Sequence, residues 1–331
     1  MENIIDVKNL TVKYFTDEGT VHAVNDISFE INRGETLGLV GETGAGKTTT
    51  ALSLLRLLQS PPGEIVDGDI VFDKDHILTL SEDQMRLVRG GKISMIFQDP
   101  MTSLNPVLTI GDQIAEVIQI HMNCGGAEAR IEGEEMLERV GIPKERYDEY
   151  PHQFSGGMKQ RVVIAIALAC KPSLLIADEP TTALDVTIQA QVIEMMKDLQ
   201  KQINTAMLLI THDLGVVADS CDHVAIMYAG EIIESGSLED IFDNPCHPYT
   251  NGLFGSIPSL DKDVKKLSPI TGDVADPTHL PTGCHFHPRC KYAEPVCKNK
   301  RPMVTSINDT HQVKCLIYES LLQTREVVKY V

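Results

Sequence analysis

The chain has few basic residues, no long apolar run and no leader of the secretory kind. Its 29 Lys and Arg residues and 47 Asp and Glu residues give a formal net charge of −18. This charge disfavours sequence-independent binding of nucleic acid. The longest wholly apolar run, Val162 to Cys170, has nine residues and is too short to span a bilayer. Met1 to Asp6 lacks the basic segment of a signal peptide. We therefore expect a cytosolic chain, and a membrane partner remains open.

Cysteine is present but does not indicate disulfides. Eight cysteines in a cytosolic chain argue against a disulfide framework, because thiols stay reduced there. They indicate metal binding or ordinary buried thiols. The 331 residues, 42% of them hydrophobic, can bury a core in one large or two modest domains.

A phosphate-binding loop is the most specific motif. Residues 41–48 match G-x-x-x-x-G-K-[ST], between an apolar strand expected at 36–40 and a helix expected to about residue 60. The glycines let backbone N–H groups turn toward an anion, and the helix N-terminus adds positive charge. Lys47 is expected to bind the β- and γ-phosphates and Thr48 to ligate Mg²⁺. The residues expected to hold the nucleotide are Gly41, Gly44, Ala45, Gly46, Lys47, Thr48 and Thr49.

Polar residues follow three further predicted strands, whose ends share one edge in a parallel sheet. Asp178 is expected to complete the Mg²⁺ shell, and Glu179 to orient or deprotonate an attacking water. Gln98 is expected to reach the metal or the water, and His212 the γ-phosphate. Each residue alone is more simply a cap or a satisfied polar group. Together they favour four strand ends on one triphosphate.

Ser155, Gly156 and Gly157 open a helix predicted from Lys159 to about Ala169. Their N–H groups form a second anion site, although taken alone the motif is better explained by an ordinary Ser-capped helix. Because one triphosphate needs one cradle, a second cradle suggests a nucleotide held by another subunit.

The rest of the pattern alternates strands and helices, which predicts an α/β fold with a largely parallel sheet covered by helices. Tyr14 and Phe15 lie in an antiparallel region, where either ring could stack on a base or pack within the sheet. The other expected elements are a hairpin at 4–33, strands at 65–80, 93–97, 174–177, 206–210 and 223–228, helices within 109–150 and at 186–202, and a hairpin at 230–236. Beyond about residue 240, prolines predict a connector with little periodicity.

These motifs, in this order, resemble those of the ATP-binding-cassette (ABC) ATPases. The resembling motifs are Walker A (41–48), the Q-loop glutamine Gln98, the signature 154–158, Walker B (174–179), the D-loop 182–185 and the switch histidine His212. Met158 departs from the general signature, which has Gln there. The resemblance implies an ABC domain over 1–240 with a RecA-like core, an antiparallel β subdomain and a helical subdomain at about 99–155. It also places Tyr14 where the family stacks adenine.

The resemblance also implies partners. ABC domains pair head to tail, each nucleotide lying between one Walker A and the other signature, and here the second subunit is expected to be a homologous ATPase in a heterodimer. Two transmembrane permease subunits are expected to contact the helical subdomain, fed by an extracellular peptide-binding protein. The chain is then expected at the cytoplasmic face of the membrane, coupling ATP hydrolysis to transport.

The C-terminal part, 241–331, resembles the extension of dipeptide and oligopeptide importer ATPases, notably in 244–250 and 283–290. Cys284, Cys290, Cys297 and Cys315 suit either an iron–sulfur cluster or a four-cysteine zinc site. The wide spacing and the resemblance favour a [4Fe–4S] cluster over zinc, and four unliganded thiols are the alternative. The remaining cysteines are expected to be ordinary thiols, namely Cys124, Cys170, Cys221 and Cys246.

Other functions stay open. An importer ATPase for nickel or another solute is the main rival to peptide import, because the cassette does not line the cargo path in this family. A soluble ABC ATPase without a transporter is a second alternative. The single cassette and the lack of a long coiled-coil insertion disfavour it.

Overall fold

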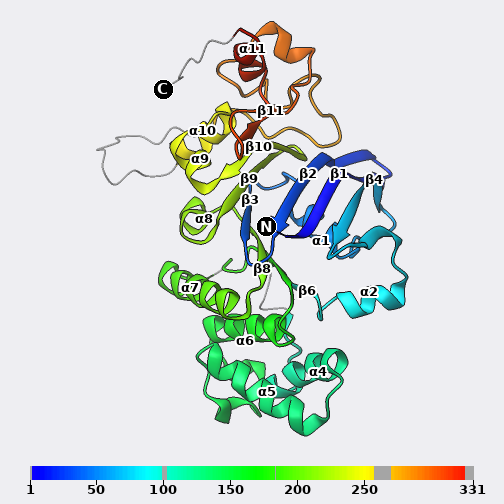
Figure 1. The fold of residues 1–331 in the computed structure, drawn as a ribbon, viewed down its shortest axis with the longest axis vertical. Helices are drawn as coiled ribbons and strands as arrows, with labels where there is room; N and C mark the ends of the chain where they lie inside the picture. Colours follow the sequence, from blue (N-terminus) through cyan, green and yellow to red (C-terminus); the bar gives the residue numbers. More distant parts are fainter. Residues whose placement is uncertain (1, 99–102, 183, 257–269, 325–331) are drawn as a thin grey trace.

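The structure, a computed structural model, describes residues 2–98, 103–182, 184–256 and 270–324. An antiparallel sheet, a larger core sheet, a helical part and a C-terminal extension are arranged along the molecule (Figure 1). Several expectations fall outside the described residues. These are the predicted start of the helical insertion at 99–102, Ala183 of the D-loop, the prolines within 257–269 and the terminal 325–331.

The antiparallel sheet has the order β2-β1-β4-β5 and confirms the hairpin expected at 4–33. Its inward residues, such as Leu10 and Ile70, are fully buried against α1 and the core sheet. The strands are β1 (Asn3–Thr16), β2 (Gly19–Asn32), β4 (Gly63–Phe72) and β5 (Asp75–His76).

The core sheet has the order β11-β12-β10-β9-β3-β8-β7-β6. The five strands from β9 to β6 run parallel, as predicted, whereas β10, β12 and β11 continue the sheet antiparallel. Leu174 and Ile176 pack on one face and Leu175 and Ala177 on the other, all of them fully buried. Burial of both faces explains the continuous apolar runs. The strands are β3 (Thr36–Val40), β6 (Ile93–Ile96), β7 (Leu174–Asp178), β8 (Ala206–Thr211), β9 (His223–Tyr228), β10 (Glu231–Ser237), β11 (Thr305–Ser306) and β12 (Gln312–Val313).

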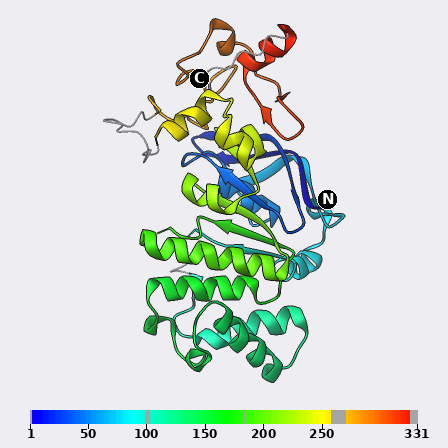
Figure 2. The same ribbon diagram turned by 60° about the vertical axis from the view of Figure 1, so that its left-hand side comes forward.

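Helices cover the core sheet and form the lower part of the molecule (Figures 1 and 2). The expected helical insertion contains α4 and α5, and α6 packs beside α7 beneath the sheet. The helices of this part are α4 (Ile110–Met122), α5 (Gly126–Arg139), η2 (Lys144–Arg146), η3 (Pro151–Gln153), α6 (Gly156–Leu168), α7 (Val186–Ile203) and α8 (Leu214–Ser220).

Two details near the N-terminal half differ from the predicted pattern. The helix α1 (Lys47–Leu54) ends well before residue 60, because Arg56 takes a left-handed backbone conformation with φ of 51°. The short helices η1 (Ile77–Thr79) and α2 (Glu82–Val88) were not predicted. The cue for α2 is local, since Ser81 and Gln84 form a capping box.

The segment after residue 240 is more regular than the predicted connector. It forms α9 (Leu238–Asp243) and α10 (Pro248–Gly255). Pro248 begins α10 because the first helical position needs no N–H and suits the fixed φ of proline. The extension then returns to the core, where β12 pairs with β10. Its remaining elements are η4 (Pro295–Lys298), β11, β12 and α11 (Leu316–Thr324).

A buried polar network fixes this return. The Glu234 carboxylate on β10 accepts hydrogen bonds from the backbone N–H groups of Cys246 (2.5 Å) and His247 (2.9 Å). It also pairs with His311 Nε2 at 2.8 Å. Burial alone would lower the pKa of His311, but contacts with Cys246 and Glu234 outweigh it and raise that pKa to about 10. The potential metal-ligand atoms of Glu234, Cys246 and His311 lie within 4.8 Å of one another. The Glu234 carboxylate, however, already has hydrogen-bond partners within this chain.

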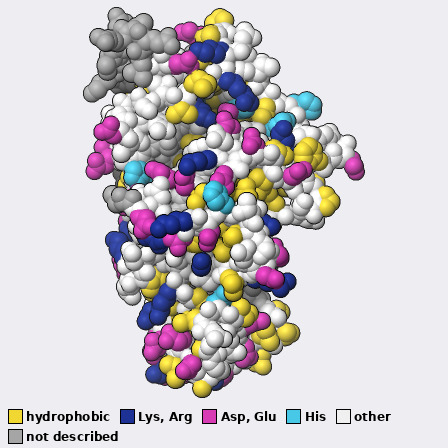
Figure 3. All heavy atoms as spheres, turned by 45° about the vertical axis from the view of Figure 1, so that its right-hand side comes forward, with side chains coloured by type: hydrophobic (Ala, Val, Ile, Leu, Met, Phe, Trp, Pro, Cys, Tyr) yellow, Lys and Arg dark blue, Asp and Glu magenta, His cyan; other side chains and the backbone are white. Residues whose placement is uncertain are grey.

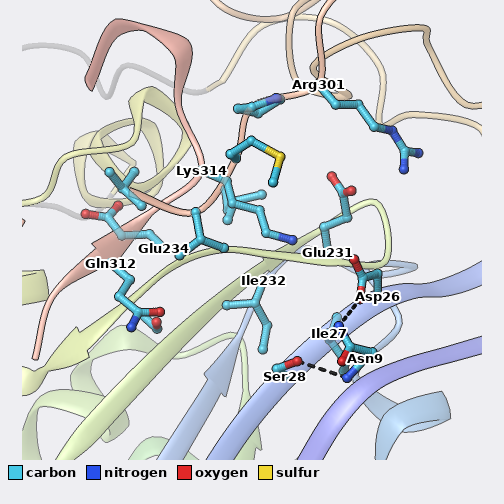
Figure 4. A pocket seen from close by; sticks show the side chains of 16 residues that line it. Asn9, Asp26, Ile27, Ser28, Glu231, Ile232, Glu234, Arg301, Gln312 and Lys314 are labelled. Carbon is cyan, nitrogen blue, oxygen red and sulfur yellow. Dashed lines mark hydrogen bonds between the residues drawn. The ribbon is translucent and has the colours of Figure 1, made fainter. Parts of the chain in front are cut away.

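The extension leaves a cavity of about 230 Å³ where it meets the antiparallel sheet. Figure 4 shows Asp26, Glu231, Arg301 and Lys314 around it, on strands of both sheets and on the extension. None of its lining residues comes from the phosphate loop. None of the helices in the described ranges has both the length and the apolar character needed to cross a lipid bilayer.

We expect His311→Gln to lower the free energy of unfolding by about 3 kcal/mol near pH 6, because it removes one partner of a buried ion pair. The pKa of His311 is raised from 6.5 to about 10, so its stabilising contribution is complete below about pH 6.5 and is lost as the pH rises through 10. Urea unfolding from pH 6 to 10 should show wild type and variant converging.

The matched control for this measurement is His279→Gln, which changes an exposed histidine paired with Asp276 and should alter stability little. A His311→Gln deficit as large at pH 10 as at pH 6 would contradict the assigned ion pair.

Candidate functional site

The phosphate loop connects β3 to α1, and its glycines are required by close packing. A Cβ on Gly41 would lie 2.2 Å from the carbonyl oxygen of Met227, and one on Gly46 2.3 Å from that of Ala23. Gly44 and Gly46 have φ of 83° and 102°, which glycine adopts readily. The structure therefore confirms the strand–loop–helix setting that the motif requires.

Lys47 lies over this loop. Its Nζ donates hydrogen bonds to the carbonyl oxygens of Gly41 (2.6 Å) and Glu42 (3.1 Å), and the residue is 7% exposed. Burial lowers the pKa of Lys47, although Glu179, Asp178 and Glu42 oppose that shift. An ammonium group held this way provides a positive charge within the loop, where a phosphate would bind.

Asp178, at the end of β7, is an unpaired buried carboxylate. It is 1% exposed, and neither oxygen has a hydrogen-bond partner among the described residues. Burial raises the pKa of Asp178, and Glu179 adds to this, whereas Thr48 and Lys47 oppose it. The Thr48 hydroxyl therefore lies close enough to Asp178 to affect its pKa. Unsatisfied carboxylate oxygens beside an exposed hydroxyl are a donor set that suits Mg²⁺.

The Glu179 carboxylate makes hydrogen bonds with side chains that follow three parallel strands. Its Oε2 accepts hydrogen bonds from Gln98 Nε2, after β6, and from Thr182 Oγ1, both at 3.1 Å. Its Oε1 lies 3.1 Å from Nδ1 of His212, after β8. Burial raises the pKa of Glu179, but the hydrogen bonds from His212, Thr182 and Gln98 outweigh it and lower that pKa. The carboxylate is therefore ionised near neutral pH.

Glu179 also has φ of 47°, a left-handed conformation that is uncommon for a side-chain-bearing residue and occurs often at functional sites. The structure thus brings Gln98, Glu179 and His212 into direct contact. Thr182 joins them, and the sequence had placed it only in the D-loop.

Ser155, Gly156 and Gly157 begin α6, three residues before the predicted start. Ser155 Oγ accepts a hydrogen bond from the backbone N–H of Met158 at 3.4 Å, so the ordinary helix cap is formed. A Cβ on Gly157 would lie 2.8 Å from Ile188 on α7, so this glycine is needed for helix packing. These residues lie in the helical part, whereas the phosphate loop precedes α1.

Tyr14 is tied to the residue after the phosphate loop. Its hydroxyl lies 3.3 Å from the Thr49 hydroxyl, and its ring packs on Gly63. Phe15 is 50% exposed and points to no such contact. This places the Tyr14 ring close to the start of α1.

Two residues of the extension also reach the phosphate loop, and the sequence did not indicate them. Tyr249 Oη accepts a hydrogen bond from the backbone N–H of Glu42 at 3.0 Å. Arg289 forms a bidentate pair with the Glu42 carboxylate, at 2.6 Å and 3.0 Å. No local pattern could have found these contacts, because they join distant parts of the chain.

The four extension cysteines lie near one another. Burial raises the pKa of Cys284 to about 11 and of Cys315 to about 12, and it also raises that of Cys290. Cys297 and Cys290 contribute to the shift of Cys284, and Cys284 and Cys290 to that of Cys315. The N–H of Cys284 also donates to the carbonyl oxygen of Cys297 at 2.9 Å.

The separation of these sulfur atoms can be compared with the separation in a bound metal site. Across the described ranges, no three of the four sulfurs lie within 4.8 Å of one another. A tetrahedral zinc ion with Zn–S bonds of about 2.3 Å would hold its sulfurs about 3.8 Å apart. Among the described residues the thiols therefore lie near one another without forming a closed metal site.

Comparison with known proteins agrees with the fold and shows the family. Residues 24–182 match the ABC transporter family and 233–297 the oligopeptide/dipeptide transporter C-terminal region. The chain is 49% identical to the oligopeptide transport ATP-binding protein AppD of Bacillus subtilis (96% of this chain, 98% of the relative). It is 50% identical to the dipeptide transport ATP-binding protein DppD of the same organism (96% of each).

Solved structures give the same class. The ATP-binding cassette MJ0796, in a dimeric post-hydrolysis state bound to ADP and Pi, has a TM-score of 0.64 at 27% identity, covering 71% of this chain and 98% of that one. The CbiO1 structure from Clostridium perfringens has a TM-score of 0.64 at 29% identity, covering 74% and 92%. The chain belongs to the ABC transporter family, within the group of oligopeptide and dipeptide transport ATP-binding proteins.

The unpaired carboxylate makes a distinctive prediction. Asp178→Asn should raise the free energy of unfolding of the metal-free chain by about 1 kcal/mol, because it removes a buried charge whose oxygens have no hydrogen-bond partner among the described residues. The same variant should lose the thermal stabilisation that Mg²⁺ and ATP give the wild type. Calorimetry with and without both ligands measures the two effects.

Asp222→Asn is the matched control, because the Asp222 carboxylate accepts a hydrogen bond from the Thr36 N–H at 2.8 Å. It should keep the ligand effect and gain no stability. If Asp178→Asn destabilises the metal-free chain, the buried carboxylate does not cost stability as predicted. If it leaves ligand stabilisation intact, Asp178 is not the cation ligand.

Proposed function

We propose that this chain hydrolyses ATP and thereby powers the import of oligopeptides or dipeptides through partner membrane subunits. The observation that carries the proposal is the meeting of Gln98, Glu179 and His212 at the sheet edge that also holds Lys47 and Asp178. Matches to peptide transport ATP-binding proteins over nearly the full chain support peptide import above nickel or another solute. They equally disfavour a soluble ABC ATPase without a transporter.

In the proposed mechanism the phosphate loop and Lys47 bind the β- and γ-phosphates. Thr48, Asp178 and Gln98 would hold Mg²⁺, which would neutralise phosphate charge. Glu179, ionised, orients the attacking water and accepts its proton. His212 contacts the γ-phosphate and, through its hydrogen bond, keeps Glu179 in place.

The remaining nucleotide contacts are also part of the proposal. Tyr14 stacks on the adenine, and its contact with Thr49 sets the ring beside the start of α1. Thr49 adds a contact to the nucleotide. Gly41, Gly44, Ala45 and Gly46 form the rest of the cradle.

A second subunit completes the site. We propose that Ser155, Gly156 and Gly157 bind the γ-phosphate of a nucleotide held by a homologous ATPase, most simply in a heterodimer. The dimeric state named for the MJ0796 structure supports pairing of this kind.

The helical part is proposed to contact two transmembrane permease subunits at the cytoplasmic face of the membrane. It exposes large apolar side chains, including Ile120, Met122 and Ile131. Figure 3 shows yellow side chains among charged ones at this lower end of the molecule. An extracellular peptide-binding protein would deliver cargo to the permease subunits, without contact to this chain. Nucleic acid is not an expected partner.

We propose that Cys284, Cys290, Cys297 and Cys315 hold a [4Fe–4S] cluster, with zinc as the alternative. Four gathered, half-buried or buried thiols are a donor set that suits either group, and the resemblance to importer ATPases favours the cluster. When bound, the cluster would cross-link the extension. The division into an ABC domain at 1–240 and an extension at 241–331 belongs to the same proposal.

Metal content tests the cysteine site. Anaerobically purified protein should contain about four iron and four acid-labile sulfide per chain. Cys290→Ser should lose most of both, whereas Cys246→Ser should retain them. Zinc without sulfide would show a zinc site in place of the cluster. The absence of both iron and zinc would refute a metal site.

The catalytic role of Glu179 has a direct test. Glu179→Gln should lower the ATP turnover of the assembled transporter by at least about a hundredfold while ATP binding persists, because the amide cannot accept the proton of the attacking water. Radiolabelled phosphate release and equilibrium ATP binding give the two readouts.

Glu194→Gln, a change at an exposed residue of α7, serves as the control and should leave both unchanged. Full turnover by Glu179→Gln would remove Glu179 from its proposed role.

A further inference from the structure

The C-terminal extension contacts the phosphate loop at one residue, Glu42. Glu42 is the second residue of the loop, and its side chain and its backbone N–H both bind the extension. The Arg289 side chain is only 4% exposed, and Tyr249 is fully buried. Contacts this well shielded are held more firmly than exposed ion pairs.

An aromatic cluster fixes both extension residues. Tyr228, at the end of β9, lies 4.8 Å from Tyr249 and 5.2 Å from Phe286 between ring centroids. The Arg289 guanidinium lies 5.7 Å from the Tyr228 ring centroid. Because Tyr228 and Phe286 are nearly fully buried, Tyr249 and Arg289 have little freedom to leave Glu42.

The contacts at Glu42 also bear on Lys47, the proposed phosphate-binding lysine. The two carbonyl oxygens that hold Lys47 Nζ belong to Gly41 and Glu42. Tyr249 fixes the N–H of the peptide unit between these residues. Arg289 in turn neutralises a carboxylate that would otherwise repel a triphosphate in the same loop, and its contact with Glu42 raises its own pKa.

We propose that Arg289 and Tyr249 are positioning residues for nucleotide binding, so that the extension sets the affinity of the phosphate loop for ATP. Arg289 directly precedes Cys290, so the cysteine-bearing segment itself supplies the contact. The inference rests on the proposed nucleotide site.

Equilibrium binding of a fluorescent ATP analogue to the full chain tests this inference. Arg289→Gln should raise the Kd about tenfold, because it leaves one unpaired negative charge in the loop. Tyr249→Phe should raise the Kd by a smaller factor, since it frees one N–H without changing charge. Arg301→Gln, which removes an arginine of the same extension that contacts His285 instead, is the control and should bind as wild type does.

Rescue separates positioning from a merely structural role. The double variant Glu42→Gln with Arg289→Gln removes the unpaired charge and should recover most of the lost affinity. Unchanged affinity in a folded Arg289→Gln chain would overturn the proposal, as would a loss that the double variant does not recover. Failure of the wild type to bind the analogue would instead refute the proposed function.

Discussion

The central parallel strands are buried on both faces, so charged side chains can enter this part of the core sheet only where the strands end. The ends of β3, β6, β7 and β8 therefore gather the polar groups that the rest of the strands exclude. In such surroundings the effective dielectric is low, and Lys47 and the unpaired Asp178 act more strongly than they would in water. Preorganised charge of this kind is what phosphoryl transfer requires of a protein.

The C-terminal extension contacts the rest of the chain at two places on the core sheet. At the far edge of the sheet, β12 pairs with β10, and His311 meets Glu234 beside that pairing. At the carboxyl edge, Arg289 meets Glu42 within the phosphate loop. The first contact fixes the position of the extension, and we propose that the second couples its cysteine-bearing segment to the nucleotide site.

Local signals made much of the site predictable. The loop at 41–48 follows from glycine conformations, and the strands before Gln98, Glu179 and His212 from apolar runs that end in polar residues. Arg289 and Tyr249 could not be predicted, because they lie 247 and 207 positions from Glu42 and no periodicity links such residues. The helix α10 was missed because Pro248 and the prolines around it were interpreted as helix breakers, although proline suits a first turn.

We propose that four strand ends form one Mg²⁺–ATP site. The most direct measurement is a crystal structure with a non-hydrolysable ATP analogue and Mn²⁺, whose anomalous signal locates the cation. We expect the cation on Thr48 and Asp178, and the γ-phosphate between Lys47 and the group of Gln98, Glu179 and His212. A cation bound elsewhere, with the Asp178 carboxylate still unpaired, would contradict it.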